Sequence, residues 1–309
     1  MPERYSKRIQ APSPPWWFYD TLIAAALAAS FGLLAAGGWY AVLGGLGAAT
    51  LLYGTFIEPR LLTVKRFGIG PDGAKDRLTI VFISDVHVGR YKKRRWIERL
   101  VRRTNALAPD LILLGGDFVA SRPSDAEGLE PFRGLKARLG VFAINGNHDG
   151  CHAPEAVRAV FARIGIPLLE NRAVRLNERG RGLAIVGLDD DWYGGADFAK
   201  AFAGVEPNDM PIVMLHNPDL APVAARYRPA VMFAGHTHGG QIRLPFIGSL
   251  SSMPHHLGRR YDRGLFHFPM SEMPGALQAP LVIGQGVGES GPRARLFCPP
   301  QIVHLILKY

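Results

Sequence analysis

Hydrophobic residues follow three patterns along the chain, and each pattern predicts a different kind of element. The first is a run of 37 residues, 21–57, that contains no Asp, Glu, Lys, Arg or His. After residue 70 the chain changes to short apolar runs, which are typical of strands buried on both faces. Segments with apolar residues at helical spacing lie between some of these runs. The chain therefore divides into an apolar N-terminal region and a mixed α/β region.

The apolar run is too long for one membrane span. One span needs about 20 residues, and a continuous helix over the run would reach about 55 Å, nearly twice the hydrocarbon core. Residues 37–40 predict a turn with interfacial aromatic residues, and residues 16–19 an aromatic belt at the other face. Three later glycines would let two helices approach closely: Gly44, Gly45 and Gly47. We therefore expect a transmembrane helical hairpin within residues 20–58.

Other interpretations of the run compete with the hairpin. A cleaved signal peptide has an apolar core of only about 7–15 residues, and no Arg-Arg pair precedes the run to indicate twin-arginine export. A hairpin buried in a soluble protein is disfavoured by the complete absence of charge. A single long, tilted span followed by an interfacial stretch stays open.

Basic residues flank the run on both sides: Arg4, Lys7 and Arg8 before it, and Arg60, Lys65 and Arg66 after it. Because positive charge accumulates on the cytoplasmic side, this pattern requires both ends inside the cell and an even number of spans. We expect residues 1–19 and the later domain to lie on the cytoplasmic face of a bacterial inner membrane.

The region after the run has the alternation of an α/β domain. A turn at 71–73 closes a predicted linker, 59–74, and the domain is expected over 75–309. Strands are predicted over 78–84, 110–114, 140–144, 183–186, 212–215, 231–234, 281–283, 294–298 and 302–308, and helices over 94–108 and 153–164. The order predicts a largely parallel central sheet with a second sheet packed on it.

Residues of the types that bind metals stand directly after the ends of most of these strands. They are Asp85 and His87 after the first strand, Asp117 after the second, Asn147 and His148 after the third, His216 after 212–215, and His236 and His238 after 231–234. Ligands bind beyond the carboxyl ends of parallel strands, and residues two apart in an extended segment project alike. Each piece alone is weak evidence of a site, but five at successive strand ends predict one metal centre.

The ligand types indicate which metals this centre would hold. Carboxylate, imidazole and amide together suit Mn, Fe or Zn better than Ca or Mg. Even without His148, the remaining seven residues are too many ligands for one zinc ion. They fit two divalent ions bridged by one carboxylate, an arrangement that activates water and clamps a phosphoryl group during in-line displacement.

In this order the motifs resemble those of the calcineurin-like metallophosphoesterases, and the segment Gly-His-Thr-His-Gly-Gly-Gln, 235–241, resembles their membrane-anchored bacterial branch. The resemblance covers about 78–309 and implies a four-layer α-β-β-α sandwich of two packed mixed sheets flanked by helices. It implies that one ion is bound by Asp85, His87 and His238, the other by Asn147, His216 and His236, and that Asp117 bridges them with a hydroxide. It further implies a catalytic role for Asn147, and for His148 as general acid or phosphate-stabilising residue.

Neighbouring residues leave alternatives open. Asp149 either orients His148 or stabilises a turn. The acidic residues 189–191 follow a predicted strand, and we favour a solvated loop over a place in the site. Only two cysteines occur, which excludes a disulfide scaffold and a Cys-rich zinc site, and Cys151 is interpreted as an incidental free thiol.

Positive charge is concentrated next to the first motif. The chain carries a formal charge of +10, and residues 90–103 contain eight basic residues and one acid. Arg90, Lys93 and Arg94 are the candidate substrate-binding residues, because a helix start near the site favours anions. A solvated helix face is the plain alternative. An anionic membrane surface or a diphosphate fits the cluster better than nucleic acid, because aromatic residues do not alternate with the charges.

These features predict an enzyme at a membrane surface that hydrolyses a phosphate mono- or diester with two divalent ions. The resemblance implies a lipid-linked diphosphate, such as UDP-diacylglucosamine in lipid A synthesis, as one substrate. A phosphodiesterase for soluble nucleotides is the alternative enzyme, and a metal-stabilised interaction module is the alternative without catalysis. No protein partner is implied.

Overall fold

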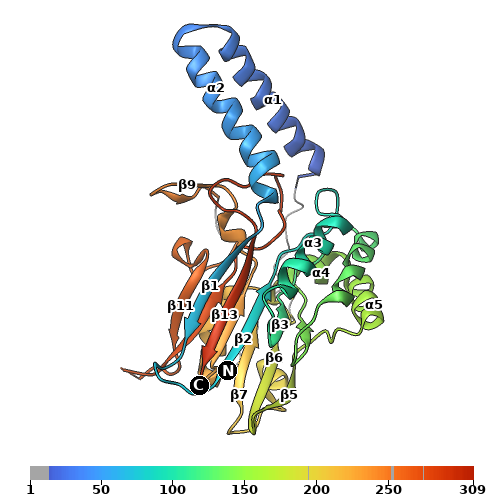
Figure 1. The fold of residues 1–309 in the computed structure, drawn as a ribbon, viewed down its shortest axis with the longest axis vertical. Coiled ribbons are helices and arrows are strands. Elements are labelled where there is room, and N and C mark those ends of the chain that lie inside the picture. The colour runs from blue at the N-terminus through green and yellow to red at the C-terminus, as the bar shows by residue number, and fades with distance from the viewer. Residues whose placement is uncertain (1–13, 194, 252–253, 274) are drawn as a thin grey trace.

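An antiparallel helical hairpin protrudes from one end of a two-sheet domain in the computed structural model, which describes residues 14–193, 195–251, 254–273 and 275–309 (Figure 1). The hairpin consists of α1 (Trp16–Ala35) and α2 (Gly38–Leu52), and α2 is extended by η1 (Tyr53–Ile57) and η2 (Glu58–Arg60). Two helical stretches, of 19 and 23 residues, are long and apolar enough to cross a membrane. The flanking Arg4, Lys7 and Arg8 lie outside the described residues.

The hairpin turns where the sequence predicts it. Gly37 has φ of 79°, in the left-handed region that glycine adopts without strain, and it separates the two helices. At Gly44 a Cβ atom would lie 2.4 Å from the carbonyl oxygen of Ser30, so only glycine permits this close approach. Trp39 and Tyr40 belong to the first turn of α2 rather than to the loop. Because most of the hairpin surface is exposed, the alternative of a buried soluble hairpin is wrong.

Two mixed sheets form the domain. The first has the order β1 (Thr63–Ile69), β13 (Gln301–Lys308), β2 (Arg77–Ile83), β3 (Leu111–Leu114) and β4 (Val141–Ala143). The second has the order β11 (Gly264–Pro269), β12 (Gln278–Ile283), β8 (Val231–Ala234), β7 (Met210–Met214), β6 (Arg181–Gly187) and β5 (Arg172–Glu178). Within them, β2, β3 and β4 run parallel, as do β6, β7, β8 and β12.

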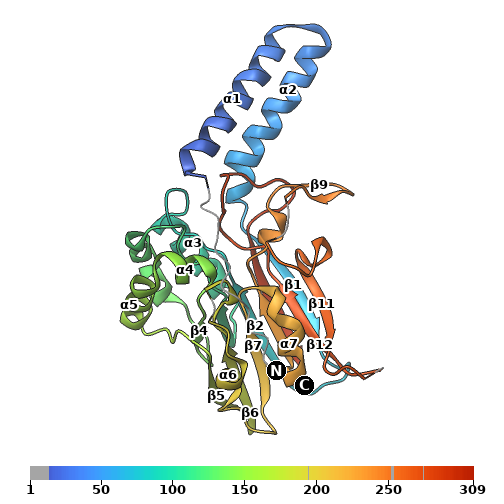
Figure 2. The same ribbon diagram turned by 180° about the vertical axis from the view of Figure 1, so that it is seen from behind.

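Helices cover the outer face of each sheet, as Figure 2 shows from behind. The first sheet is covered by α3 (Arg94–Asn105), η3 (Pro123–Gly134) and α5 (Pro154–Ile164), and the second by α6 (Phe198–Phe202) and α7 (Ala221–Ala224). The remaining helical segments are short: α4 (Asn147–His152), η4 (Asp191–Tyr193), η5 (Pro218–Leu220), η6 (Ala225–Tyr227), η7 (His238–Gly240) and η8 (Arg259–Tyr261). Apolar side chains from both sheets fill the centre, where Phe82 stacks on Phe233 at 5.2 Å between ring centroids. The predicted four-layer sandwich is confirmed.

The structure departs from the sequence prediction at its edges. The expected linker contains β1, which pairs in parallel with β13 at the edge of the first sheet. The strand predicted over 294–298 is wrong. Its residue Phe297 has φ of 53°, and the backbone N–H groups of Phe297 and Cys298 donate to the buried carboxylate of Glu58 instead of to a strand. The edge strands β5 and β11 were not predicted, because polar residues interrupt their apolar pattern.

Candidate metal centre

The parallel strands of both sheets end at the same edge of the sandwich, on the side where the hairpin emerges. Asp85 and His87 follow β2, Asp117 follows β3, and Asn147 and His148 follow β4. His216 follows β7, and His236 and His238 follow β8. The structure thus brings buried side chains from four separate chain segments together, and Asn147 and His148 of a fifth segment line a cavity beside them.

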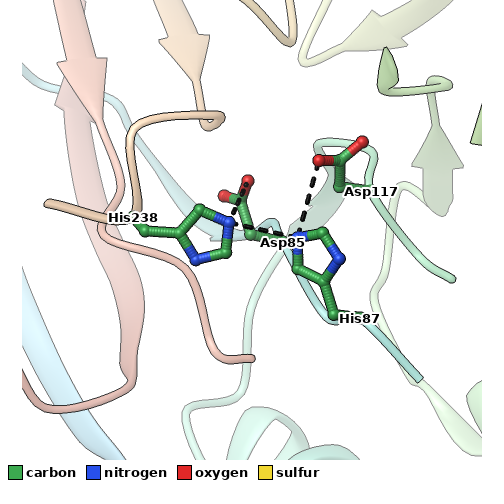
Figure 3. A group of neighbouring side chains, drawn as sticks. All are labelled: Asp85, His87, Asp117 and His238. Atoms are coloured by element: carbon green, nitrogen blue, oxygen red, sulfur yellow. Dashed lines mark hydrogen bonds and ion pairs between the residues drawn. The ribbon is translucent and has the colours of Figure 1, made fainter. Parts of the chain in front are cut away.

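One group of four buried side chains has ligand atoms that all lie within 4.8 Å of one another: Asp85, His87, Asp117 and His238 (Figure 3). The Nε2 atoms of His87 and His238 face each other at 3.1 Å. Nε2 of His87 lies 3.5 Å from Oδ2 of Asp117, and Nε2 of His238 lies 3.6 Å from Oδ1 of Asp85. Two nitrogens and two carboxylates therefore converge on a space the size of a cation.

A second group contains Asp117 again, with His216 and His236. Nε2 of His216 lies 3.3 Å from Oδ2 of Asp117, the same oxygen that faces His87. Nδ1 of His236 lies 3.3 Å from Nε2 of His216. Asp117 thus stands between the two groups, which is the position a bridging carboxylate requires.

For His216 and His236, backbone carbonyls select which ring nitrogen faces the centre. Nδ1 of His216 donates to the carbonyl oxygen of Gly115 at 2.8 Å, so Nε2 carries the free lone pair. Nε2 of His236 donates to the carbonyl oxygen of Pro254 at 3.1 Å, so Nδ1 carries it. Fixing the tautomer through the second nitrogen is typical of metal-binding histidines.

The donor set fits two divalent cations. The amide Oδ1 of Asn147 is buried and has no hydrogen-bond partner among the described residues, and Asn147 lines a cavity with Asp117 and His236. Burial lowers the pKa of His87 to about 3, so this ring is neutral and able to coordinate near pH 7. Burial alone would raise the pKa of Asp117, yet the imidazoles around it bring that pKa well below its usual range.

The backbone is strained at most candidate ligands. Positive φ angles occur at Asp85 (53°), His87 (46°), Asp117 (54°), His236 (68°) and His238 (51°). Non-glycine residues in this region cost about 1–3 kcal/mol each, and such residues cluster where function requires an unusual side-chain direction. Their concentration at one buried edge marks the place as a functional site.

Gly146 was not singled out from the sequence, although the centre depends on it. A Cβ atom there would lie 2.3 Å from Oδ1 of Asp117 and 2.8 Å from Cε1 of His216. No side chain fits at this position without moving a candidate ligand. In the sequence, the only indication of this role is a glycine directly before Asn147, and a glycine at such a place is equally typical of an ordinary turn.

The structure separates the roles of His148 and Asp149. Nδ1 of His148 donates to the carbonyl oxygen of Ala120 at 2.7 Å, and its ring lies edge-on to that of His87. Asp149 accepts from the backbone N–H groups of Gly146, Phe118 and Val119, at 2.8–3.1 Å. Asp149 therefore stabilises the turn, and Ala120 holds the ring of His148.

The expected solvated loop at 189–191 is wrong for two of its three residues. Asp190 and Asp191 are buried. Oδ1 of Asp191 accepts from Nδ2 of Asn217 at 2.9 Å, next to the candidate ligand His216. Burial also raises the pKa of Asp190 to about 7. These carboxylates pack behind the centre, a contact between distant segments that no local pattern reveals.

The basic segment is only partly available to an anion. Lys92 is buried, and its ammonium pairs with Glu289 at 3.0 Å. Nε of Arg94 pairs with Glu98 at 3.0 Å along the surface of α3. Arg90, whose Nε lies 3.8 Å from Oδ2 of Asp20 on α1, and Lys93 are both exposed and line a cavity of about 740 Å³. Arg94 does not line this cavity, so only two of the three candidate substrate-binding residues, Arg90 and Lys93, do so.

This cavity, which we call the α1 groove, joins the centre to the base of the hairpin. It is lined by His87 and His148, by the basic residues Arg90, Lys93 and Arg122, and by Trp17 and Tyr19 of α1. The hydroxyl of Tyr91 donates to Asp20 of α1 at 2.7 Å, which ties the helix to this edge of the domain. A second cavity of about 500 Å³ is lined by Asp117, His148, Trp192 and His236. His148 therefore lies between two hollows.

Comparison with known proteins agrees with this geometry. Residues 78–240 match the family model of calcineurin-like phosphoesterases. The chain is 30% identical to an uncharacterized metallophosphoesterase, YkuE, of Bacillus subtilis, over 90% of this chain and 94% of that protein. It is 27% identical to the UDP-2,3-diacylglucosamine pyrophosphatase LpxG of Chlamydia muridarum, over 82% and 91%. It is 34% identical to the phosphodiesterase YaeI of Escherichia coli, over 55% and 63%.

Proposed function

The chain belongs to the calcineurin-like phosphoesterase family and is a hydrolase of phosphate esters, and from this we propose that it acts on a lipid-linked phosphate ester at a membrane surface. The observation that carries the substrate class is the α1 groove, because it connects the candidate centre to an apolar hairpin. A soluble substrate would need no such connection.

We assign the candidate ligands to two ions. Asp85, His87 and His238 would hold one, Asn147, His216 and His236 the other, and Asp117 would bridge them. When bound, such a pair supplies an activated water and neutralises the charge of the phosphoryl group. Mn, Fe and Zn all suit this mixture of donors.

His148 is proposed as the general acid. Because Nδ1 donates to the carbonyl oxygen of Ala120, Nε2 is the nitrogen left to give a proton to the departing oxygen. The ring lines both cavities beside the centre, so a leaving group in either one comes within its reach. Asn147 would act by holding an ion rather than by moving a proton.

The lipid-linked substrate follows from the chemistry along the α1 groove. Arg90, Lys93 and Arg122 offer positive charge to a phosphate or diphosphate beside the centre. Trp17 and Tyr19, at the end of α1 that meets the domain, offer an amphipathic surface to an acyl chain. Two related proteins that are named UDP-2,3-diacylglucosamine pyrophosphatases support a diphosphate joined to a diacylated sugar.

Substrate presentation tests this proposal. Full-length protein in nanodiscs is expected to hydrolyse UDP-diacylglucosamine with a higher kcat/KM than a soluble nucleotide diphosphate sugar. Lys93→Gln should raise KM for the lipid-linked substrate about fivefold, since one basic residue near an anionic group contributes about 1 kcal/mol. Lys136→Gln is the matched control, because Lys136 is an exposed lysine that lines a cavity on another part of the domain. Equal rates on both substrates would contradict the lipid-linked assignment.

We also propose that the domain faces the cytoplasm. The antiparallel hairpin has both of its ends at the domain (Figure 1). The basic residues Arg60, Lys65 and Arg66 follow the hairpin, and positive charge accumulates on the cytoplasmic side of a membrane. Reporters that work only inside or only outside a bacterial cell, fused after Tyr19, Gly38 and Gly70, should therefore read inside, outside and inside. If the fusion after Gly70 reads outside, the cytoplasmic location is wrong and substrates confined to the cytoplasm are excluded. A fusion after Tyr19 that reads inside would then show one span, and one that reads outside would show an inverted hairpin.

A further inference from the structure

A short two-stranded ribbon lies beside the base of the hairpin. Its strands, β9 (Arg243–Leu244) and β10 (Gly248–Ser249), pair antiparallel. The ribbon follows soon after the candidate ligand His238, so it leaves the sandwich at the edge where the centre lies. In both views β9 lies next to the end of α2 that meets the domain (Figures 1 and 2).

The tip of this ribbon is apolar and exposed. Residues 244–250 read Leu-Pro-Phe-Ile-Gly-Ser-Leu and include no charged residue. The side chain of Phe246 is fully exposed, and those of Ile247 and Leu250 are 67% and 51% exposed. Large apolar side chains gathered on a surface mark a place of interaction. The residues 245–247 with Leu250 are called the ribbon tip below.

The root of the ribbon is fixed to the domain while its tip is not buried. Nη1 of Arg243 donates to the carbonyl oxygen of Gly239 at 2.8 Å and pairs with Asp262. The backbone of Ile242 pairs with that of Leu296 in an isolated bridge. These contacts hold the ribbon in one place relative to the centre.

The same contacts make the ribbon continuous with the hairpin. Leu296 is followed by Phe297, whose backbone N–H donates to Oε2 of Glu58 at 3.0 Å, just beyond α2. Phe297 is itself exposed, as are Phe56 and Ile57 at the end of the helix. Exposed apolar side chains therefore occur at the base of the hairpin, at Phe297 and on the ribbon, three places that these backbone contacts connect.

We propose that the ribbon tip inserts into the interfacial layer of the membrane that the hairpin spans. This inference rests on the proposed membrane location of the hairpin. A bilayer is the occupant because the tip is uncharged, contains aromatic and branched apolar side chains, and lies at the level where α2 leaves the apolar span. With the hairpin as one attachment and the ribbon tip as a second, the domain is held in one orientation, and the α1 groove stays at the membrane surface.

Site-specific quenching in nanodiscs tests the insertion. Full-length protein with Cys151→Ser, which removes the exposed thiol, carries one added cysteine labelled with an environment-sensitive fluorophore. The test position is Phe246→Cys. The control is Leu277→Cys, also an exposed apolar residue, located before β12. Because β12 runs parallel to β8, Leu277 lies at the opposite end of the sandwich from the candidate ligands after β8. Leu43→Cys, exposed on α2, reports the hairpin itself.

We expect lipids with a nitroxide near the glycerol end of the acyl chain to quench the label at 246 severalfold more than the label at 277. Iodide in solution should quench the label at 277 and spare the label at 246. If the label at 43 is quenched by lipid but the label at 246 is quenched only by iodide, the ribbon inference is overturned and the membrane hairpin stands. If lipid quenches neither 43 nor 246, the membrane location fails as well. Protection of 246 from both quenchers would overturn the inference in favour of a protein surface.

Discussion

Asp117→Asn should abolish most of the activity, by about 100-fold or more, and weaken the binding of both ions. The backbone N–H of His148 donates to Oδ1 of Asp117 at 2.8 Å, and an asparagine would keep this bond through its amide oxygen. Its NH₂ group would then replace Oδ2, the atom that lies 3.5 Å from His87 and 3.3 Å from His216. A neutral hydrogen-bond donor, which cannot bind a cation, would then lie between the two groups of candidate ligands.

Bound metal and turnover of a bis-aryl phosphodiester measure this effect directly. The melting temperature of the metal-free protein should change little, because the substitution keeps the shape and the backbone hydrogen bond. Asp76→Asn is the matched control, since Asp76 pairs with Arg179 on the surface. Two ions at normal affinity together with normal turnover in Asp117→Asn would show that Asp117 does not bridge.

His148→Ala should lower turnover by about 10²–10⁴-fold for esters with a poor leaving group, and far less for aryl esters. An aryl oxide departs without a proton, whereas an alkoxide needs one, so only the second reaction depends on Nε2 of His148. The ring of His148 donates to the carbonyl oxygen of Ala120 and lines both cavities. Because His148 is not one of the proposed metal ligands, its removal should leave those ligands in place.

The ratio of the two rates, with metal content measured in parallel, separates this role from a structural one. His267→Ala is the control, because His267 is an exposed histidine on the edge strand β11, and it should leave both rates unchanged. An equal loss on both esters, or a loss of bound metal, would be incompatible with a general acid at His148.

The sequence predicted the parts of the fold that depend on local pattern. Buried strands such as β2 and β3 are continuous apolar runs, and an aspartate shortly after each of them, Asp85 or Asp117, belongs to the candidate centre. The hairpin turn was predicted because Gly37 is a local signal. The assignment of individual residues to ions or to proton transfer stays a prediction.

Features that depend on distant partners could not be predicted. Nothing near Lys92 in the sequence shows that Glu289 will bury it and remove it from the basic surface. The strand predicted at 294–298 is apolar enough, yet its N–H groups are taken by Glu58, about 240 positions earlier. The local sequence around Asp191 is typical of a surface loop, but Asp191 is buried and accepts a hydrogen bond from Asn217, 26 positions later. In each case, tertiary contacts override the local pattern.

Titration of metal-stripped full-length protein with Mn²⁺, with hydrolysis of a bis-aryl phosphodiester followed at each addition, tests the two-metal hydrolase most directly. Two groups of ligand atoms that share Asp117 predict that turnover rises to a plateau at two bound ions per chain. Full turnover at one ion per chain, or turnover that does not depend on the metal, would contradict a dinuclear centre built from these residues.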